Sequence, residues 1–167
     1  MYKIGLDIHG VIDKHPDLFS ILSKEAKENG WEVHILTGPP LKRKYRTHRG
    51  KFDTIEEELE SYNIFYDNIF SIVSYNLKVG SPNTVDSKGN FWFEEEVWNK
   101  TKSIYCKEND IDILIDDTEV YGDYFHTPFA YLGSYKNGKS FLNIKNKVKP
   151  KIFDFIVKHF RGEIVIE

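Results

Sequence analysis

Three short segments of the sequence combine side chains that could support phosphoryl chemistry. Asp7 and His9 lie at the end of the first apolar run of the chain. Thr37 and Gly38 follow a second run, and the adjacent carboxylates Asp116–Asp117 follow a third. Two adjacent carboxylates at the edge of a core repel each other, so they need a cation. A carboxylate cluster with few Cys or His residues favours a hard ion such as Mg²⁺.

The other residues of these segments suit a phosphate ester. The hydroxyl of Thr37 and the glycine beside it provide hydrogen-bond donors for a phosphoryl oxygen. A carboxylate such as Asp7 can act as a nucleophile and form an acyl phosphate. The residue types alone therefore indicate metal-assisted phosphoryl chemistry.

The elements that must position these residues alternate along the chain. Short apolar runs predict strands, and three- and four-residue apolar spacing predicts helices. Strands that alternate with helices favour an α/β fold with a mostly parallel sheet, whose ligands bind at the carboxyl ends of the strands. The predicted strands are 3–8, 31–36, 69–75, 111–115, 129–132 and 164–166, and the predicted helices are 16–29, 41–62, 94–109 and 152–160.

Length and composition narrow the class of protein. The chain has 167 residues, which predicts a single domain over 1–167. Its net charge of −3 argues against a generally basic nucleic-acid binder, and its 15% aromatic residues argue against disorder. The lone Cys106 cannot form an internal disulfide, and no apolar run reaches the length of a membrane span. Charge also appears too early for a signal peptide, so we expect a cytoplasmic protein with no membrane partner.

The order of these motifs resembles the haloacid-dehalogenase-like (HAD) phosphatase superfamily. The chain contains DIHG starting at Asp7, LTG starting at Leu36, a lysine, and IDD starting at Ile115. The resemblance extends from Lys3 to about Leu132. Within the family, the chain is similar in a general way to the small deoxynucleotidase-type members. It implies a Rossmann-like parallel sheet flanked by helices.

The resemblance also implies roles for individual residues. Asp7 would be the nucleophile, and Thr37 would bind the phosphate, with Gly38 beside it in the substrate site. Mg²⁺ would be held by Asp7, by the backbone carbonyl of His9, and by Asp116 or Asp117.

The family carries a lysine that stabilises the nucleophile and the charge of the transferring phosphoryl group. Lys102 precedes Asp116 by fourteen residues, a spacing similar to that of the family. We therefore expect Lys102 to bind the substrate and act in catalysis, with Lys100 as the second choice.

His9 is the main departure from the family pattern. Phosphatases of this family usually carry an aspartate at that position, which protonates the leaving group and then activates water. An imidazole titrates near pH ~6.5 and can serve as both acid and base. We therefore expect His9 to take over this role. The alternative is that His9 marks a loss of turnover.

Two segments could select the substrate. Residues 76–93 are rich in turn formers and leave room only for a small flap or hairpin, so we expect little or no cap domain. The basic run Lys42–Lys51 begins a few residues after Thr37. It could attract a phosphorylated small molecule, a nucleotide or a nucleic-acid end, although charge runs are commonly solvated surface.

The leading hypothesis is a Mg²⁺-dependent phosphomonoester hydrolase that works through an aspartyl phosphate. One alternative is a non-catalytic phosphate- or nucleotide-binding protein that retains the metal site. Another is a phosphotransferase that uses the same Asp7.

Overall fold

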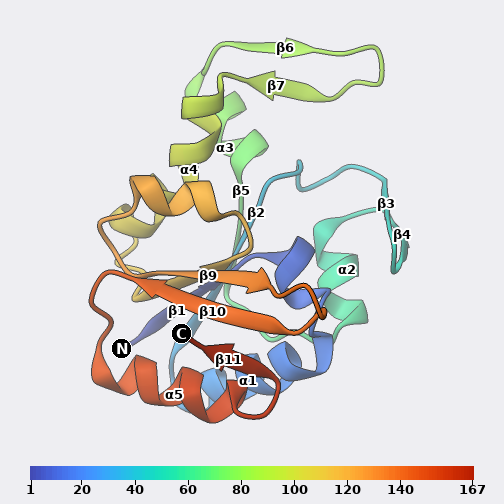
Figure 1. The fold of residues 1–167 in the computed structure, drawn as a ribbon. Coiled ribbons are helices and arrows are strands. Elements are labelled where there is room, and N and C mark those ends of the chain that lie inside the picture. Colours follow the sequence, from blue (N-terminus) through green and yellow to red (C-terminus); the bar gives the residue numbers. More distant parts are fainter.

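A computed structural model describes all residues 1–167 and shows an α/β fold built on a seven-stranded sheet (Figure 1). Helices cover both faces of the sheet. The helices are α1 (Pro16–Glu28), α2 (Ile55–Ser61), α3 (Ile72–Val79), α4 (Glu95–Glu108) and α5 (Pro150–Phe160). The sheet strands are β1 (Lys3–Leu6), β2 (Glu32–Thr37), β5 (Asn68–Ser71), β8 (Ile113–Asp116), β9 (Phe129–Ser134), β10 (Ser140–Lys145) and β11 (Ile164–Ile166).

The sheet is mostly parallel, as the sequence predicts. Its strand order is β11-β10-β9-β8-β1-β2-β5, and only the β9–β10 pair is antiparallel. The first strand, β1, lies between β2 and β8 and runs parallel to both. After β1, the chain thus adds β2 and β5 on one side of β1 and later adds β8 and the remaining strands on the other side. Such a change of direction is where open parallel sheets bind their ligands.

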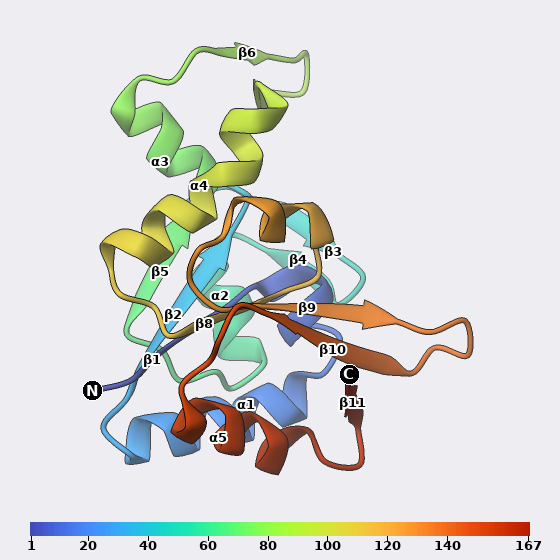
Figure 2. The same cartoon turned by 60° about the vertical axis from the view of Figure 1, so that its left-hand side comes forward.

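Alternation along the strands divides the core between the two faces of the sheet. Ile113 and Ile115 belong to the larger apolar cluster with α1 and α5, whereas Leu114 belongs to the smaller cluster with α4. Figure 2 shows α1 and α5 together on one side of the sheet and α4 on the other. Asp116 has the same alternation as Leu114, so its side chain faces α4.

Two small hairpins project beyond the sheet. The first joins β3 (Tyr45–Thr47) to β4 (Gly50–Phe52), and the second joins β6 (Asn83–Val85) to β7 (Phe91–Phe93). The second hairpin stands above α3 and α4 at the top of Figure 1. There is no separate cap domain.

The structure differs from the predicted elements in several places. The strand predicted over 3–8 ends at Leu6. Residues 45–52 form the β3–β4 hairpin, so the predicted helix over 41–62 is wrong before Ile55. The strand predicted over 69–75 ends at Ser71, whose hydroxyl accepts a hydrogen bond from the Ser74 amide and caps α3. Strand β10 was not predicted.

None of the helices combines the length and the apolar character needed to cross a lipid bilayer.

Candidate functional site

The register of the sheet brings the three predicted segments together. Leu6 pairs with Ile35 on β2 and with Ile115 on β8. Asp7, the residue directly after β1, therefore lies beside Asp116, and its amide still donates to the Ile115 carbonyl at 3.0 Å. Thr37 ends the neighbouring strand on the other side. The side chains proposed to do chemistry thus meet at one edge of three adjacent strands.

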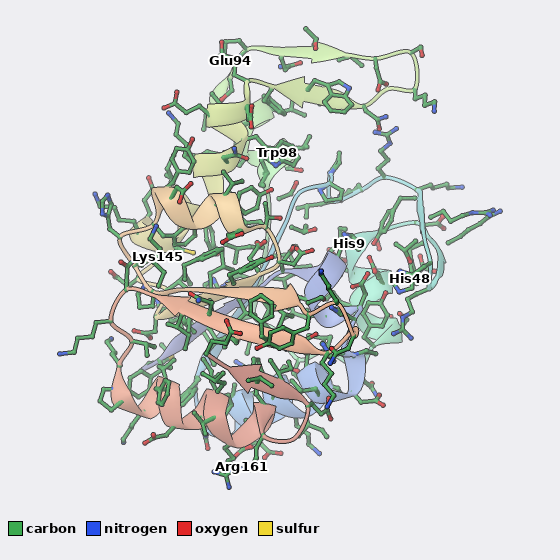
Figure 3. The ribbon with its side chains drawn as sticks, viewed as in Figure 1. His9, His48, Glu94, Trp98, Lys145 and Arg161 are labelled. Carbon is green, nitrogen blue, oxygen red and sulfur yellow. The ribbon has the colours of Figure 1, made fainter.

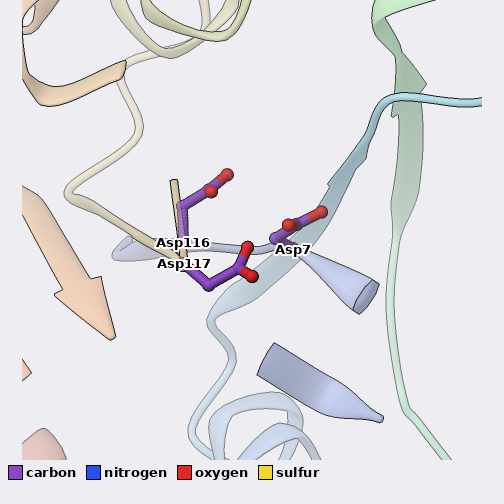
Figure 4. Close-up of side chains that lie close together, drawn as sticks. All are labelled: Asp7, Asp116 and Asp117. Carbon is purple, nitrogen blue, oxygen red and sulfur yellow. The ribbon is translucent and has the colours of Figure 1, made fainter. Parts of the chain in front are cut away.

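The three carboxylates form a compact acidic group. Asp7, Asp116 and Asp117 each offer an oxygen, and these oxygens lie within 4.8 Å of one another (Figure 4). Asp7 and Asp116 are buried, whereas Asp117 is exposed. Gly10 makes room for this group, because a Cβ at that position would lie 1.9 Å from Oδ2 of Asp117. Gly10 also has φ +89°, which other residues rarely adopt.

Lys102 supplies a positive charge directly beside these carboxylates. Its Nζ atom lies 2.6 Å from Oδ2 of Asp116 and 3.2 Å from Oδ1 of Asp7, and the residue is only 2% exposed. Burial disfavours the ammonium, but the charges of Asp116 and Asp7 outweigh this effect and raise the pKa of Lys102. Lys102 is therefore the lysine that faces the acidic group.

The two buried carboxylates are less acidic than usual. Burial raises the pKa of Asp116 to about 6, against the opposing charge of Lys102. Burial also raises the pKa of Asp7, and the nearby charge of Asp117 acts in the same direction. The ammonium of Lys102, 2.6 Å from Asp116, favours the charged form of this carboxylate. A further positive charge would relieve the repulsion that remains among the three carboxylates.

Thr37 and Gly38 lie where the sequence predicts, at the end of β2. The Thr37 Oγ1 atom is buried and has no hydrogen-bond partner within the chain. A buried hydroxyl without a partner is costly, so this atom can accept or donate one more hydrogen bond. Gly38 packs against Trp98, and a Cβ at Gly38 would lie 3.0 Å from the indole ring. The backbone at Gly38 is thus held close to α4.

His9 is held by a buried carboxylate that the sequence analysis did not select. Its Nε2 atom lies 2.8 Å from Oε1 of Glu58, which is 0% exposed. The same Oε1 accepts a hydrogen bond from Tyr45 at 2.6 Å, and Oε2 accepts one from Tyr62 at 2.6 Å. The Nδ1 atom of His9 makes no hydrogen bond within the chain, and 32% of the side chain is exposed. Glu58 therefore orients the ring and leaves one nitrogen available.

The pKa values of this pair follow from the same contact. Burial opposes the charged form of His9, but the hydrogen bond and the charge of Glu58 raise its pKa above the ordinary value. Burial likewise opposes the charged form of Glu58, but the hydrogen bonds from His9, Tyr45 and Tyr62 lower its pKa.

Glu58 could have been found from helical periodicity. It lies in the acidic run 56–60, which looks like solvated surface when read as composition. On the helix, however, Glu58 shares a face with Ile55, Leu59 and Tyr62, all of which are buried. An acidic residue on an apolar face requires a partner. The sequence pattern contained this signal, but the partner His9 lies 49 residues away.

The residues present fit a divalent cation of the Mg²⁺ class. The donors are carboxylate oxygens, which such a cation prefers, and Gly10 leaves the space that Asp117 occupies. No protein-family model matches the chain, and no curated protein matches it.

Proposed function

We propose that the chain is a Mg²⁺-dependent phosphomonoester hydrolase of the HAD type. The observation that carries the proposal is the acidic group itself. Three carboxylates from two neighbouring strand ends converge within 4.8 Å, and Lys102 contacts two of them. A structural ion pair would need only one of these acids. The surplus of negative charge favours a site that binds a cation together with a phosphate ester.

In this proposal Asp7, Asp116, Asp117 and the backbone carbonyl of His9 would hold the cation. When bound, Mg²⁺ supplies charge stabilisation to the phosphoryl oxygens. Asp116 already accepts hydrogen bonds from Lys102 and from the Thr118 amide, which fix its orientation.

The first step is attack by an Asp7 oxygen on phosphorus. The new O–P bond forms as the ester P–O bond breaks in line, which gives an aspartyl phosphate and an alcohol. Lys102 lies 3.2 Å from Asp7 and would stabilise the charge of the transferring group. Thr37 would donate its unpartnered hydroxyl to a phosphoryl oxygen. His9 would give its proton to the leaving oxygen.

The second step returns the enzyme to its starting state. His9, now neutral, accepts a proton from water as the water oxygen attacks phosphorus. The P–O bond to Asp7 breaks, phosphate leaves, and His9 is again protonated. Glu58 supports this cycle by stabilising the charged ring.

A comparison of Asp7→Asn with wild type tests the proposal. We expect wild-type protein to hydrolyse p-nitrophenyl phosphate with Mg²⁺ and to lose the activity with a chelator. Asp7→Asn should fold normally, because it keeps the shape of the side chain, and it should lose activity by orders of magnitude. Asp123→Asn is the matched control, since Asp123 is exposed and forms an ion pair with Lys145.

Retention of more than about a tenth of the activity in Asp7→Asn would contradict the assignment of the nucleophile. If wild type binds Mg²⁺ and phosphate but turns over no ester, the non-catalytic binding protein becomes the better hypothesis.

A further inference from the structure

A large cleft lies between the β6–β7 hairpin and the segment that follows β2. It has a volume of about 1150 Å³. This exceeds the roughly 300–1,000 Å³ of typical small-molecule pockets. One wall comes from residues 39–46, and the other comes from the hairpin and the start of α4. We call it the hairpin cleft.

The hairpin side of the cleft is aromatic. Phe91 and Phe93 alternate with Trp92 along β7, so their side chains share one face of the strand. Both phenylalanines are half-buried, whereas Trp92 is 60% exposed. The Phe93 ring lies 6.5 Å from the Trp98 ring, between centroids. Flat aromatic surfaces of this kind accept a stacked planar ring.

The lining of the cleft as a whole is cationic, and three of its four cations lie on the wall opposite the hairpin. The lining includes four cationic side chains and one carboxylate, Glu95. Arg43 donates to the carbonyls of Gly89 and Lys88 at 3.1 and 2.8 Å, so it ties this segment to the hairpin. The remaining cations are Lys44, Arg46 and Lys88. Lys44 and Arg46 are exposed. The Lys44 Nζ atom lies 4.0 Å from Oδ1 of Asp53, and Arg46 makes no hydrogen bond or ion pair through its side chain. The excess positive charge favours an anionic ligand.

The cleft adjoins the acidic site at two points. Trp98 packs on Gly38 and donates to the Tyr121 hydroxyl at 2.7 Å, and the Tyr121 ring lies 5.3 Å from Lys102 Nζ. On the other wall, the Tyr45 ring lies 6.0 Å from the His9 ring. Figure 3 shows Trp98 beneath the hairpin, between it and the part of the molecule that holds His9. None of the three carboxylates lines the cleft, so the leaving group of a phosphate ester at Asp7 would have to pass Trp98 or Tyr45 to reach it.

We propose that the hairpin cleft binds a nucleotide with two phosphates. One phosphate is cleaved at Asp7, and the rest of the nucleotide, which is the leaving group, carries the second phosphate. The nucleobase stacks on the aromatic wall, and Lys44 and Arg46 pair with the additional phosphate. The proposal rests on the proposed function for the phosphate that is cleaved. This proposal goes beyond the proposed function because it assigns a second phosphate site, which lies outside the acidic group. A nucleoside bisphosphate and the phosphorylated end of an oligonucleotide both offer this chemistry.

Steady-state kinetics with four esters test this assignment. The esters are adenosine 3′,5′-bisphosphate, adenosine 5′-monophosphate, a 5′-phosphorylated trinucleotide and glycerol 3-phosphate. We expect wild type to show a lower KM for the bisphosphate than for the monophosphate. The double variant Lys44→Ala/Arg46→Ala should raise the KM for the bisphosphate by roughly 10-fold. It should also flatten the salt dependence of that KM, because two of the charges that attract the anion are removed.

The matched control is Lys42→Ala/Lys51→Ala. It removes the same charge from the same basic run, but neither residue lines the cleft. Its KM values should equal those of wild type. Phe91→Leu/Phe93→Leu should raise KM for all adenosine esters by roughly 10-fold, because stacking is lost, and leave glycerol 3-phosphate unaffected. Val85→Ala on the same hairpin controls for a loosened hairpin.

Binding to the Asp7→Asn protein separates this inference from the proposed function. Calorimetry with the bisphosphate in Mg²⁺ reports on the cleft even if no ester is turned over. The inference is wrong if this protein binds the bisphosphate no more tightly than the monophosphate. It is also wrong if Lys44→Ala/Arg46→Ala and its control behave alike. A lower KM for the trinucleotide than for the bisphosphate would identify an oligonucleotide end as the source, and the reverse order a free nucleotide.

Discussion

At the scale of single residues, the site is defined by how each buried charge is compensated. The ammonium of Lys102 lies beside the carboxylates of Asp116 and Asp7 and compensates one of their two negative charges. The carboxylate of Glu58 compensates the charge of protonated His9. Asp117 has no basic partner within salt-bridge distance. The three carboxylates of the acidic group therefore carry more negative charge than Lys102 compensates. The uncompensated charge is what a cation would neutralise.

Removal of His9 should affect substrates according to their leaving groups. An alkyl phosphate needs protonation of its leaving oxygen, whereas nitrophenolate leaves without help. We expect His9→Ala to slow turnover of ethyl phosphate by about 100-fold or more and to affect the phosphorylation of Asp7 by p-nitrophenyl phosphate much less. Rapid-quench measurement of the phosphoenzyme checks this. Equal slowing with both esters would count against His9 as the proton donor.

Glu58 should act through His9 and not on the substrate directly. Glu58→Gln keeps the shape of the side chain but removes the charge that stabilises the protonated ring. We expect kcat for ethyl phosphate to fall by a smaller factor than in His9→Ala, with KM nearly unchanged. Tyr62→Phe is the control, because it removes a hydrogen bond to Glu58 but leaves the contact with His9. If Glu58→Gln and Tyr62→Phe have the same kcat, Glu58 has only a structural role.

At the scale of elements, the β6–β7 hairpin depends on its turn rather than on a core. Asp86 accepts hydrogen bonds from the amides of Lys88 and Asn90, both at 2.9 Å, and from the Trp92 indole at 3.0 Å. The hydrogen bonds from Asn90 and Trp92 lower the pKa of Asp86 to about 2. Neither strand of this hairpin contains a buried residue. Besides the pairing of its two strands, its local order therefore comes from one carboxylate, from the contact with Arg43 and from Phe93 beside Trp98.

Loss of the Asp86 side chain should loosen the hairpin without unfolding the protein. We expect Asp86→Ala to increase amide exchange and tryptic cleavage at Lys88, while the melting temperature stays close to that of wild type. Ser87→Ala is the control, because the Ser87 side chain makes no hydrogen bond within the chain. An unchanged exchange rate at Lys88 would show that Asp86 does not organise this turn.

At the scale of the whole molecule, the sheet holds like charges close together at the carboxyl ends of two strands. The carboxyl ends of β1 and β8 are adjacent because the two strands are parallel neighbours in the sheet. The acids at those ends cannot move apart without disrupting the ladder between the strands. The native state therefore contains repulsion that the unfolded chain lacks. This repulsion links stability to cation binding.

Mg²⁺ should stabilise the wild-type protein. A ligand that binds only the folded state adds about 2.7 kcal/mol when its concentration is about 100 times Kd, which corresponds to several degrees in Tm. We expect Asp117→Asn to raise Tm without Mg²⁺, because repulsion is relieved, and to lose most of the shift caused by Mg²⁺. Differential scanning calorimetry with Asp123→Asn as control measures both effects. A Mg²⁺ shift of the same size in Asp117→Asn would place the cation elsewhere.

His15 should make stability depend on pH. Burial lowers its pKa, and the neighbouring Lys14 acts in the same direction against Glu163. Between the ordinary value near ~6.5 and the lower folded value, the unfolded chain binds more protons. This contribution to stability is therefore present above ~6.5 and is lost as pH falls through the folded pKa. In urea titrations between pH 8 and pH 5, we expect His15→Gln to lose less stability than wild type. Parallel curves would contradict this.

The sequence by itself determined the α/β class and the chemistry of the strand ends. Apolar runs and helical spacing predict most of the sheet, since burial of strands and amphipathic helices is a local property of the pattern. The acids at Asp7, Asp116 and Asp117 could be named because polar residues directly after a buried strand are exceptional. Lys102, which lies inside α4, could be named only from the family resemblance and its spacing to Asp116. The β3–β4 hairpin was missed because charged residues at 42–51 have no apolar period that separates a strand from a helix.

Only the tertiary structure decided which distant side chains become partners. The contact of His9 with Glu58 spans 49 residues, and the hairpin cleft joins residues 39–46 to residues 88–99. Such pairings depend on strand order and on the placement of loops between strands, which local pattern does not encode. Burial gives the physical reason. Glu58 carries the same charge as its exposed neighbours in the sequence. Because Glu58 lies on the buried face of α2, its carboxylate needs a partner and pairs with His9.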